Sequence, residues 1–98
     1  MDVALSVNRV SIRLTDERWS HIVNAHDDLA GYYDDCLQTI EEPDLILPGL
    51  NGSLKAVKNY GRNRYLVVIY REIDRTDGFV VTAYFVRHID RRKAIWRR

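Results

Sequence analysis

Cysteine is almost absent from this chain, since Cys36 stands alone among 98 residues. A single cysteine cannot close a disulfide within the chain, and without other cysteines it cannot seed a zinc cluster. Long apolar runs are missing too, because the longest, at residues 66–70, is far shorter than the roughly 20 residues that span a bilayer. No apolar segment near the N-terminus has the pattern of a secretion signal. We therefore expect a cytoplasmic protein with no membrane partner.

The length of the chain leaves room for one hydrophobic core and no second domain, because domains rarely subdivide below about 100 residues. Hydrophobic residues make up 46% of the chain and charged residues 30%, which is typical of a folded globular protein. A disordered chain would be less apolar. We expect residues 1–98 to form a single domain with a basic C-terminal tail at residues 91–98.

The net charge of +1 conceals an uneven distribution of charged residues. Residues 1–48 hold three basic and ten acidic side chains, whereas residues 49–98 hold twelve basic and four acidic ones. Such asymmetry indicates a surface suited to a polyanion. The alternative is that the opposite charges pair with one another across the fold.

Motifs for metals and nucleotide cofactors are missing. His21, His26 and His88 have neither an HExxH nor a CxxC companion, so their spacing gives no support to a metal site. The GxGxxG pattern and the phosphate-binding loop are also absent. We therefore expect no cofactor and no metal.

Hydrophobic periodicity predicts two amphipathic helices in the first half of the chain. Thr15 is suited to cap the first helix, whose apolar stripe ends at His26. Asp27 or Asp28 can cap the second helix, which Pro43 stops.

Strands are predicted at residues 10–14, 44–47, 53–60, 64–73 and 79–88. The short turns between the later strands indicate antiparallel hairpins. In the last strand Thr82 and Tyr84 should share one face, with Phe79 and Phe85 beneath helices on the other. The expected fold is α+β, with two N-terminal helices packed on one face of a mainly antiparallel sheet of about four to five strands.

Several polar residues would suit cleavage of a phosphodiester without a metal ion. RNA supplies its own nucleophile, the 2′-OH, so the protein needs an acid–base group, cations near the phosphate and hydroxyl groups to position it. A histidine titrates near neutral pH and suits the acid–base role. The residues that furnish these parts are His26, Lys58, Thr82, Tyr84 and Arg87. Each also has a structural explanation, because Thr and Tyr favour strands and a strand lysine commonly lies at a solvated edge.

A family resemblance is carried by residues 14–26, 28–32, 39–44, 64–68 and 78–87, together with Lys58. These runs resemble the small phage-associated branch of the barnase, EndoU, colicin and RelE-like (BECR) nuclease superfamily. The likeness extends over almost the whole chain, from about residue 12 to residue 87. It implies a RelE-like or barnase-like fold with the activity of an endoribonuclease, a hydrolase.

The resemblance also implies site residues. It assigns catalysis to His26, Lys58, Thr82 and Tyr84, with Arg87 as a phosphate partner. One departure is that Arg87 alternates to the face opposite Thr82 and Tyr84.

A second departure is Asp27, which stands where the family pattern often has proline.

The position of Arg87 leaves two alternatives open. Either a bulge reorients Arg87, or Arg62, Arg64 or Lys55 takes its role. The residues expected to contact RNA are Arg87, Lys55, Arg62, Arg64 and His21.

The expected function is that of a metal-independent endoribonuclease that cleaves mRNA, tRNA or rRNA and leaves a 2′,3′-cyclic phosphate. Such a chain would be the toxin of a toxin–antitoxin pair or a phage-borne effector, with a cognate antitoxin or immunity protein as partner. The sequence leaves open whether the chain forms a homodimer. One alternative is a non-catalytic RNA-binding module that stacks bases on Tyr60, Tyr65, Tyr70 and Tyr84. Another is a protein-interaction subunit that uses the acidic helices.

Overall fold

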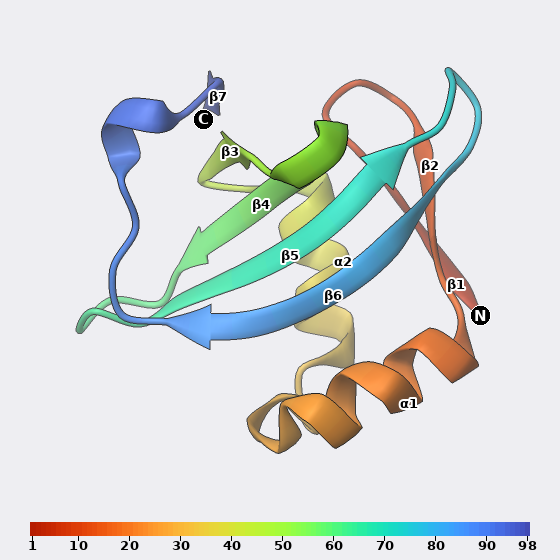
Figure 1. Ribbon diagram of the computed structural model, residues 1–98, viewed down its shortest axis with the longest axis horizontal. Coiled ribbons are helices and arrows are strands. Elements are labelled where there is room, and N and C mark those ends of the chain that lie inside the picture. Colours follow the sequence, from red (N-terminus) through yellow and green to blue (C-terminus); the bar gives the residue numbers. More distant parts are fainter.

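The computed structural model describes residues 1–98, and its elements follow the hydrophobic pattern of the chain (Figure 1). The α-helices are α1 (Asp16–Ala25) and α2 (Tyr33–Glu41), and 3₁₀ turns lie at Asp27–Leu29, Leu50–Gly52 and Arg91–Lys93. The strands are β1 (Asp2–Leu5), β2 (Ser11–Leu14), β3 (Leu45–Pro48), β4 (Leu54–Asn59), β5 (Tyr65–Glu72), β6 (Gly78–Val86) and β7 (Trp96–Arg97). The predicted helices and the five predicted strands are therefore present.

The helix boundaries follow from local chemistry. The Thr15 hydroxyl oxygen accepts a hydrogen bond from the backbone N–H of Arg18 (3.1 Å), which confirms the predicted cap of α1. The second helix begins later than predicted, because a 3₁₀ turn follows His26 and α2 starts only at Tyr33. It ends just before Pro43, as predicted. Neither helix is long and apolar enough to cross a membrane.

The sheet differs from the predicted one, because the prediction of a mainly antiparallel sheet with about four to five strands is wrong in the number of strands. Seven strands form one mixed sheet in the order β1-β2-β6-β5-β4-β3-β7. Strand β2 pairs with β6 in parallel, through Ile12 with Gly78 and Arg13 with Phe79. The other pairings are antiparallel. The N-terminal β1 and the C-terminal β7 add the two outer strands that the sequence pattern did not indicate.

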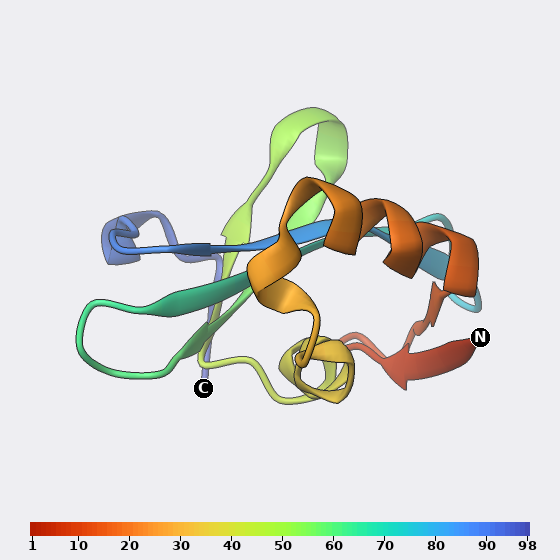
Figure 2. The ribbon, with the colours of Figure 1, turned by 90° about the horizontal axis from the view of Figure 1, so that it is seen from below.

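The two helices do not both cover one face of the sheet, which corrects the predicted packing. Helix α2 lies across one face, here called the inner face, whereas α1 runs alongside β6 (Figures 1 and 2). Helix α1 can lie alongside β6 because β2 pairs with only the first two residues of that strand. The rest of that edge of β6 has no strand partner. The C-terminal end of α1 therefore lies close to the opposite face, here called the outer face.

A β-bulge in β6 at Val81 decides which side chains face the helices. Ile69 pairs with Thr82, but its neighbour Tyr70 pairs with Val80. Thr82 and Tyr84 share the outer face, as predicted, and Phe85 packs against the inner core. Phe79 does not join Phe85, because the bulge reverses the alternation before Thr82.

Tyr70 lies in the inner core, where its side chain is fully buried among apolar residues. Its hydroxyl group has no hydrogen-bond partner, and burial raises the pKa of Tyr70 above its usual value. A buried polar group without a partner costs free energy that a water-exposed one does not.

The substitution Tyr70→Phe is therefore expected to raise the free energy of unfolding, by about 1 kcal/mol. It removes the unpaired hydroxyl group and keeps the ring that fills the core. Urea denaturation of the two proteins measures the difference. As a control, Tyr33→Phe removes a hydroxyl that donates to Asp2 (2.7 Å) and should not stabilise the protein. A loss of stability in Tyr70→Phe would show that the hydroxyl is hydrogen-bonded after all.

The basic C-terminal tail is part of the sheet. Strand β7 pairs with β3 through Arg97 with Leu45 and Trp96 with Ile46. The segment between β6 and β7 packs Ile89 and Ala94 against a small second core on the outer face. The buried members of this second core are Leu45, Val57 and Val67.

Candidate functional site

The excess positive charge of the second half pairs with the excess negative charge of the first half in one ion pair only. Of the five ion pairs in the structure, one joins a basic residue of the second half to an acidic residue of the first. This pair is Arg98 with Asp44, whose Nη1 and Oδ1 atoms are 3.8 Å apart. Pairing therefore does not account for the charge asymmetry, and most of the basic side chains remain available to a ligand.

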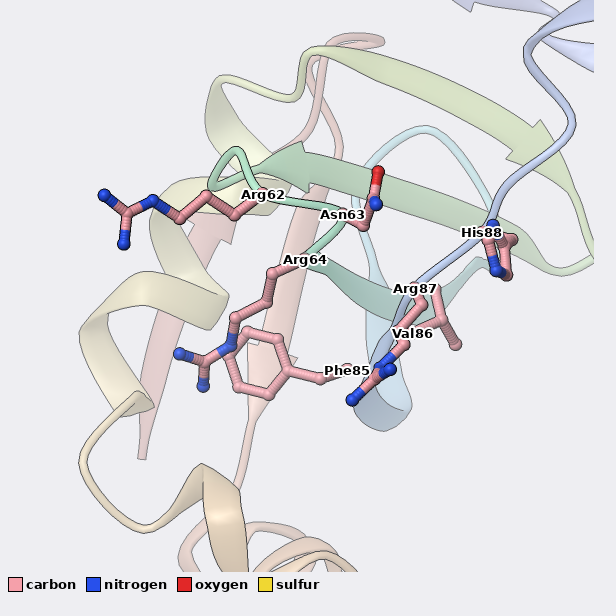
Figure 3. A pocket seen from close by; sticks show the side chains of 7 residues that line it. All are labelled: Arg62, Asn63, Arg64, Phe85, Val86, Arg87 and His88. Carbon is pink, nitrogen blue, oxygen red and sulfur yellow. The ribbon is translucent and has the colours of Figure 1, made fainter.

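Three of these free arginines line one hollow of about 570 Å³ at the end of β6 (Figure 3). We call it the arginine hollow; its lining residues are Arg62, Asn63, Arg64, Phe85, Val86, Arg87 and His88. No acidic side chain lines it, and none of its arginines takes part in an ion pair. Such a concentration of positive charge attracts an anion.

Aromatic rings hold Arg64 in place. Its guanidinium carbon lies 4.1 Å from the centroid of the Phe85 ring and 5.5 Å from that of Tyr32. Cation–π contacts of this kind fix the group without neutralising its charge. In the view of Figure 3 the Arg64 and Arg87 side chains lie to either side of Phe85, while Arg62 extends outward. The cations are therefore displayed around an aromatic support.

The aromatic support is itself anchored to α2. The Tyr60 ring packs against Phe85, with 5.9 Å between their centroids, and its hydroxyl group donates a hydrogen bond to Asp35. Burial, together with the Asp35 carboxylate, raises the pKa of Tyr60. Tyr60 therefore stays neutral and acts as a structural residue.

The turn between β4 and β5 contains two residues other than glycine that have a positive φ angle. Arg62 has a φ of 54° and Asn63 a φ of 58°, in the left-handed region that a Cβ disfavours. Arg64 directly precedes Tyr65 and Arg87 directly follows Val86, the last paired residues of the hairpin, and both arginines line the arginine hollow. Backbone strain of the kind seen at Arg62 is commonly found at binding sites.

The structure brings His26 and Tyr84 together from opposite ends of the sequence. His26 ends α1, where its backbone N–H donates to the carbonyl of Ile22 (2.8 Å). Its half-buried ring lies beside that of Tyr84, with 6.0 Å between the ring centroids. Thr82 lies on the same face of the sheet, two residues before Tyr84. Three of the four predicted catalytic residues are therefore neighbours.

Lys58, the fourth, is elsewhere. It pairs with Leu66, a residue of the inner core, and its Nζ donates to Gln38 Oε1 of α2 (3.1 Å). Lys55 instead shares the outer face with Tyr84, and the two side chains line the same two hollows. Of the basic residues in β4, the structure thus groups Lys55 and not Lys58 with the predicted catalytic residues.

Two further histidines have contrasting positions. His21 is exposed on α1, where its Nε2 is 3.8 Å from Oε1 of Glu17, and it lines none of the hollows. His88 lines the arginine hollow, although the sequence analysis gave it no role. The sequence did contain an indication that His88 lies near the site. It is four residues after Tyr84 in the same alternating strand pattern, which places both side chains on one face.

Other kinds of site have less support in the structure. No group of three or more His, Cys, Asp or Glu side chains is arranged to hold a metal ion. Burial raises the pKa of the Cys36 thiol to about 12, so this cysteine is no nucleophile. Comparisons with family models, curated proteins and solved structures found no match for this chain. Function therefore has to be inferred from the residues themselves.

Proposed function

We propose that this protein is a metal-independent endoribonuclease of the toxin type. The observation that carries the proposal is the position of His26 beside Tyr84, on the strand that ends in the carboxylate-free arginine hollow. Acid–base groups next to unpaired cations are what cleavage of RNA by its own 2′-OH requires. The family resemblance of the sequence points to the same activity.

In the proposed reaction the neutral imidazole of His26 takes the proton from the 2′-OH of RNA. The 2′ oxygen then attacks the adjacent phosphorus, and the bond from phosphorus to the 5′ oxygen breaks. The Tyr84 hydroxyl group delivers a proton to the leaving 5′ oxygen, with Thr82 orienting the phosphate. The products are a 2′,3′-cyclic phosphate and a free 5′-OH. Neither water nor a metal ion is consumed in this step.

The arginines and Lys55 would stabilise the negative charge that grows on the phosphate oxygens. Arg87 lies at the bend that directly follows β6, three residues after Tyr84, so their Cα atoms are at most about 10 Å apart. One short stretch of RNA can therefore contact both groups. Fixed donors aimed at a developing charge commonly contribute roughly 10²–10³-fold to the rate.

Incubation of the purified protein with total RNA in EDTA tests the proposal. We expect cleavage to proceed in the chelator and to leave fragments with 2′,3′-cyclic phosphate and 5′-OH ends. Mapping of the fragment ends measures both the chemistry and the cleaved sequence. Cleavage that requires added Mg²⁺, or fragments with 5′-phosphate ends, would contradict this mechanism.

A second candidate function is RNA binding without cleavage, which the unpaired arginines alone would support. The structure narrows its predicted stacking surface, because Tyr70 is fully buried and cannot meet a base. Tyr65 is half-buried, with its hydroxyl oxygen 3.3 Å from Nη2 of Arg91. Retention of intact RNA by the wild-type protein would favour this function over the nuclease. An antitoxin or immunity protein, if the chain has one, would then be expected to cover the arginine hollow with acidic side chains.

A further inference from the structure

We infer that a second hollow, next to the arginine hollow, is a subsite for one base of a single-stranded nucleic acid. This inference rests on the proposed binding of a polynucleotide by the arginine hollow. The second hollow measures about 310 Å³ and lies between β6 and the segment that follows it. We call it the C-terminal hollow. Its volume is at the small end of the range for ligand pockets.

The lining of the C-terminal hollow suits a flat aromatic ring. Its apolar surface comes from Leu47, Val67, Val86 and Ile89. Tyr84 forms a wall, and its half-buried ring offers a face on which a base can stack. Unpaired bases of single-stranded nucleic acids are held in this way, by stacking on aromatic and apolar side chains. A base inside a duplex cannot enter such a site, so the substrate would be single-stranded.

Positive groups surround this apolar lining. Lys55 and Lys93 carry positive charges there, and the imidazole of His88 also lines the hollow. The one acidic side chain there, Asp90, accepts three hydrogen bonds from Arg92, at 3.1 Å from the backbone N–H, 3.1 Å from Nε and 3.2 Å from Nη2. This arginine fork balances the Asp90 charge, and a polyanion can therefore approach the hollow.

The two hollows adjoin each other, which sets the order of base and phosphate. Val86 and His88 line both of them, so a base in the C-terminal hollow places its own phosphate beside the arginines. Tyr84 is the common element of this arrangement, because it walls the base subsite and also contacts His26. The base bound here would therefore belong to a nucleotide at the scissile bond.

A matched pair of single-stranded probes separates base binding from phosphate binding. One is oligodeoxythymidylate, and the other is an abasic deoxyribose oligomer with the same number of phosphates. Neither has a 2′-OH, so neither can be cleaved by the proposed reaction. We expect the wild-type protein to bind the base-bearing probe roughly 5- to 150-fold more tightly, the usual effect of stacking one base. Fluorescence anisotropy at fixed salt concentration measures both affinities.

Two variants should remove this preference. Ile89→Trp fills the C-terminal hollow, and Tyr84→Leu removes the stacking ring while keeping an apolar wall. Both are expected to bind the two probes equally, and Ile89→Trp should keep the wild-type affinity for the abasic probe. Ile95→Trp is the matched control, since Ile95 is 60% exposed and lines no hollow. Thermal denaturation shows whether each variant is folded, and Tyr84→Leu decides the test if Ile89→Trp is not.

The possible results separate this inference from the proposed function. If the wild-type protein binds both probes with equal affinity, the base subsite is wrong, while phosphate binding by the arginine hollow stands. The same conclusion follows if the folded variants keep the full preference for bases. If the wild-type protein binds neither probe nor RNA, both the base subsite and the proposed function fail.

Discussion

Replacing His26 by alanine is expected to lower RNA cleavage by roughly 10²–10⁴-fold, the usual contribution of a positioned acid–base group. The fold and the affinity for RNA should change little, because the ring lies at the end of α1 and outside the arginine hollow. Initial rates of cleavage in EDTA, with RNA in excess, measure the effect.

His21→Ala is the matched control for this experiment. It removes the same side chain from the same helix, but from a position that faces solvent beside Glu17. We expect the variant to cleave RNA at the wild-type rate. Full activity in His26→Ala together with loss of activity in His21→Ala would move the catalytic role to His21. Normal cleavage by both variants would exclude histidine catalysis from α1.

The second large effect is expected from the double substitution Arg64→Gln, Arg87→Gln, which should weaken RNA binding roughly 100-fold at low salt. Two charge-assisted contacts of about 1.5 kcal/mol each give this factor, because 1.4 kcal/mol corresponds to a tenfold change in affinity. Glutamine keeps much of the length of arginine but removes the charge. Titration of labelled single-stranded RNA, followed by anisotropy, measures the loss.

A control with the same change in net charge is Arg18→Gln, Arg75→Gln. Both of these arginines are exposed, form no ion pair and line no hollow. The slope of log affinity against log salt should fall by about 0.7 for each phosphate contact that the test variant loses. Equal losses in the two double variants would mean that net charge, and not the arginine hollow, governs binding.

The local elements of the fold could be predicted from the sequence, but the outer strands of the sheet could not. Thr15 and Pro43 mark helix ends by their own chemistry, and the structure agrees with both. Strand β1 spans Asp2–Leu5 and has one buried side chain, Ala4, so it shows little alternation. Strand β7 is two residues of a basic segment, and only its pairing with β3 makes it a strand. Such pairing is a property of the folded chain and leaves no periodic signal.

The bulge at Val81 could not be predicted from the sequence either. Strict alternation places Phe79 with Phe85, and a single extra residue reverses it. Gly78 offers a partial signal, because a Cβ there would overlap the carbonyl oxygen of Arg71 and the side chain of Ile12. A glycine at the start of a strand can indicate such a close approach, but it does not say where the register shifts.

Part of the candidate site was accessible from spacing alone. Lys55 and Lys58 are three residues apart in one strand, so they must face opposite ways, and only one of them could accompany Tyr84. Which one does so depends on the register between β4, β5 and β6. The contact between His26 and Tyr84 depends in turn on the path of α1 along β6. Both are long-range features that local pattern does not encode.

Strand β7 also bears on how the protein can be shortened. It covers the edge of β3, whose residues Leu45 and Ile46 are almost fully buried. Removal of residues 91–98 would leave the backbone carbonyl groups of Asp44 and Ile46, which accept hydrogen bonds from the N–H groups of Arg98 and Ile95, without these partners along an apolar edge. Exposed edges of this kind join to other chains and promote aggregation. A truncation intended only to remove basic charge would therefore be expected to yield insoluble protein.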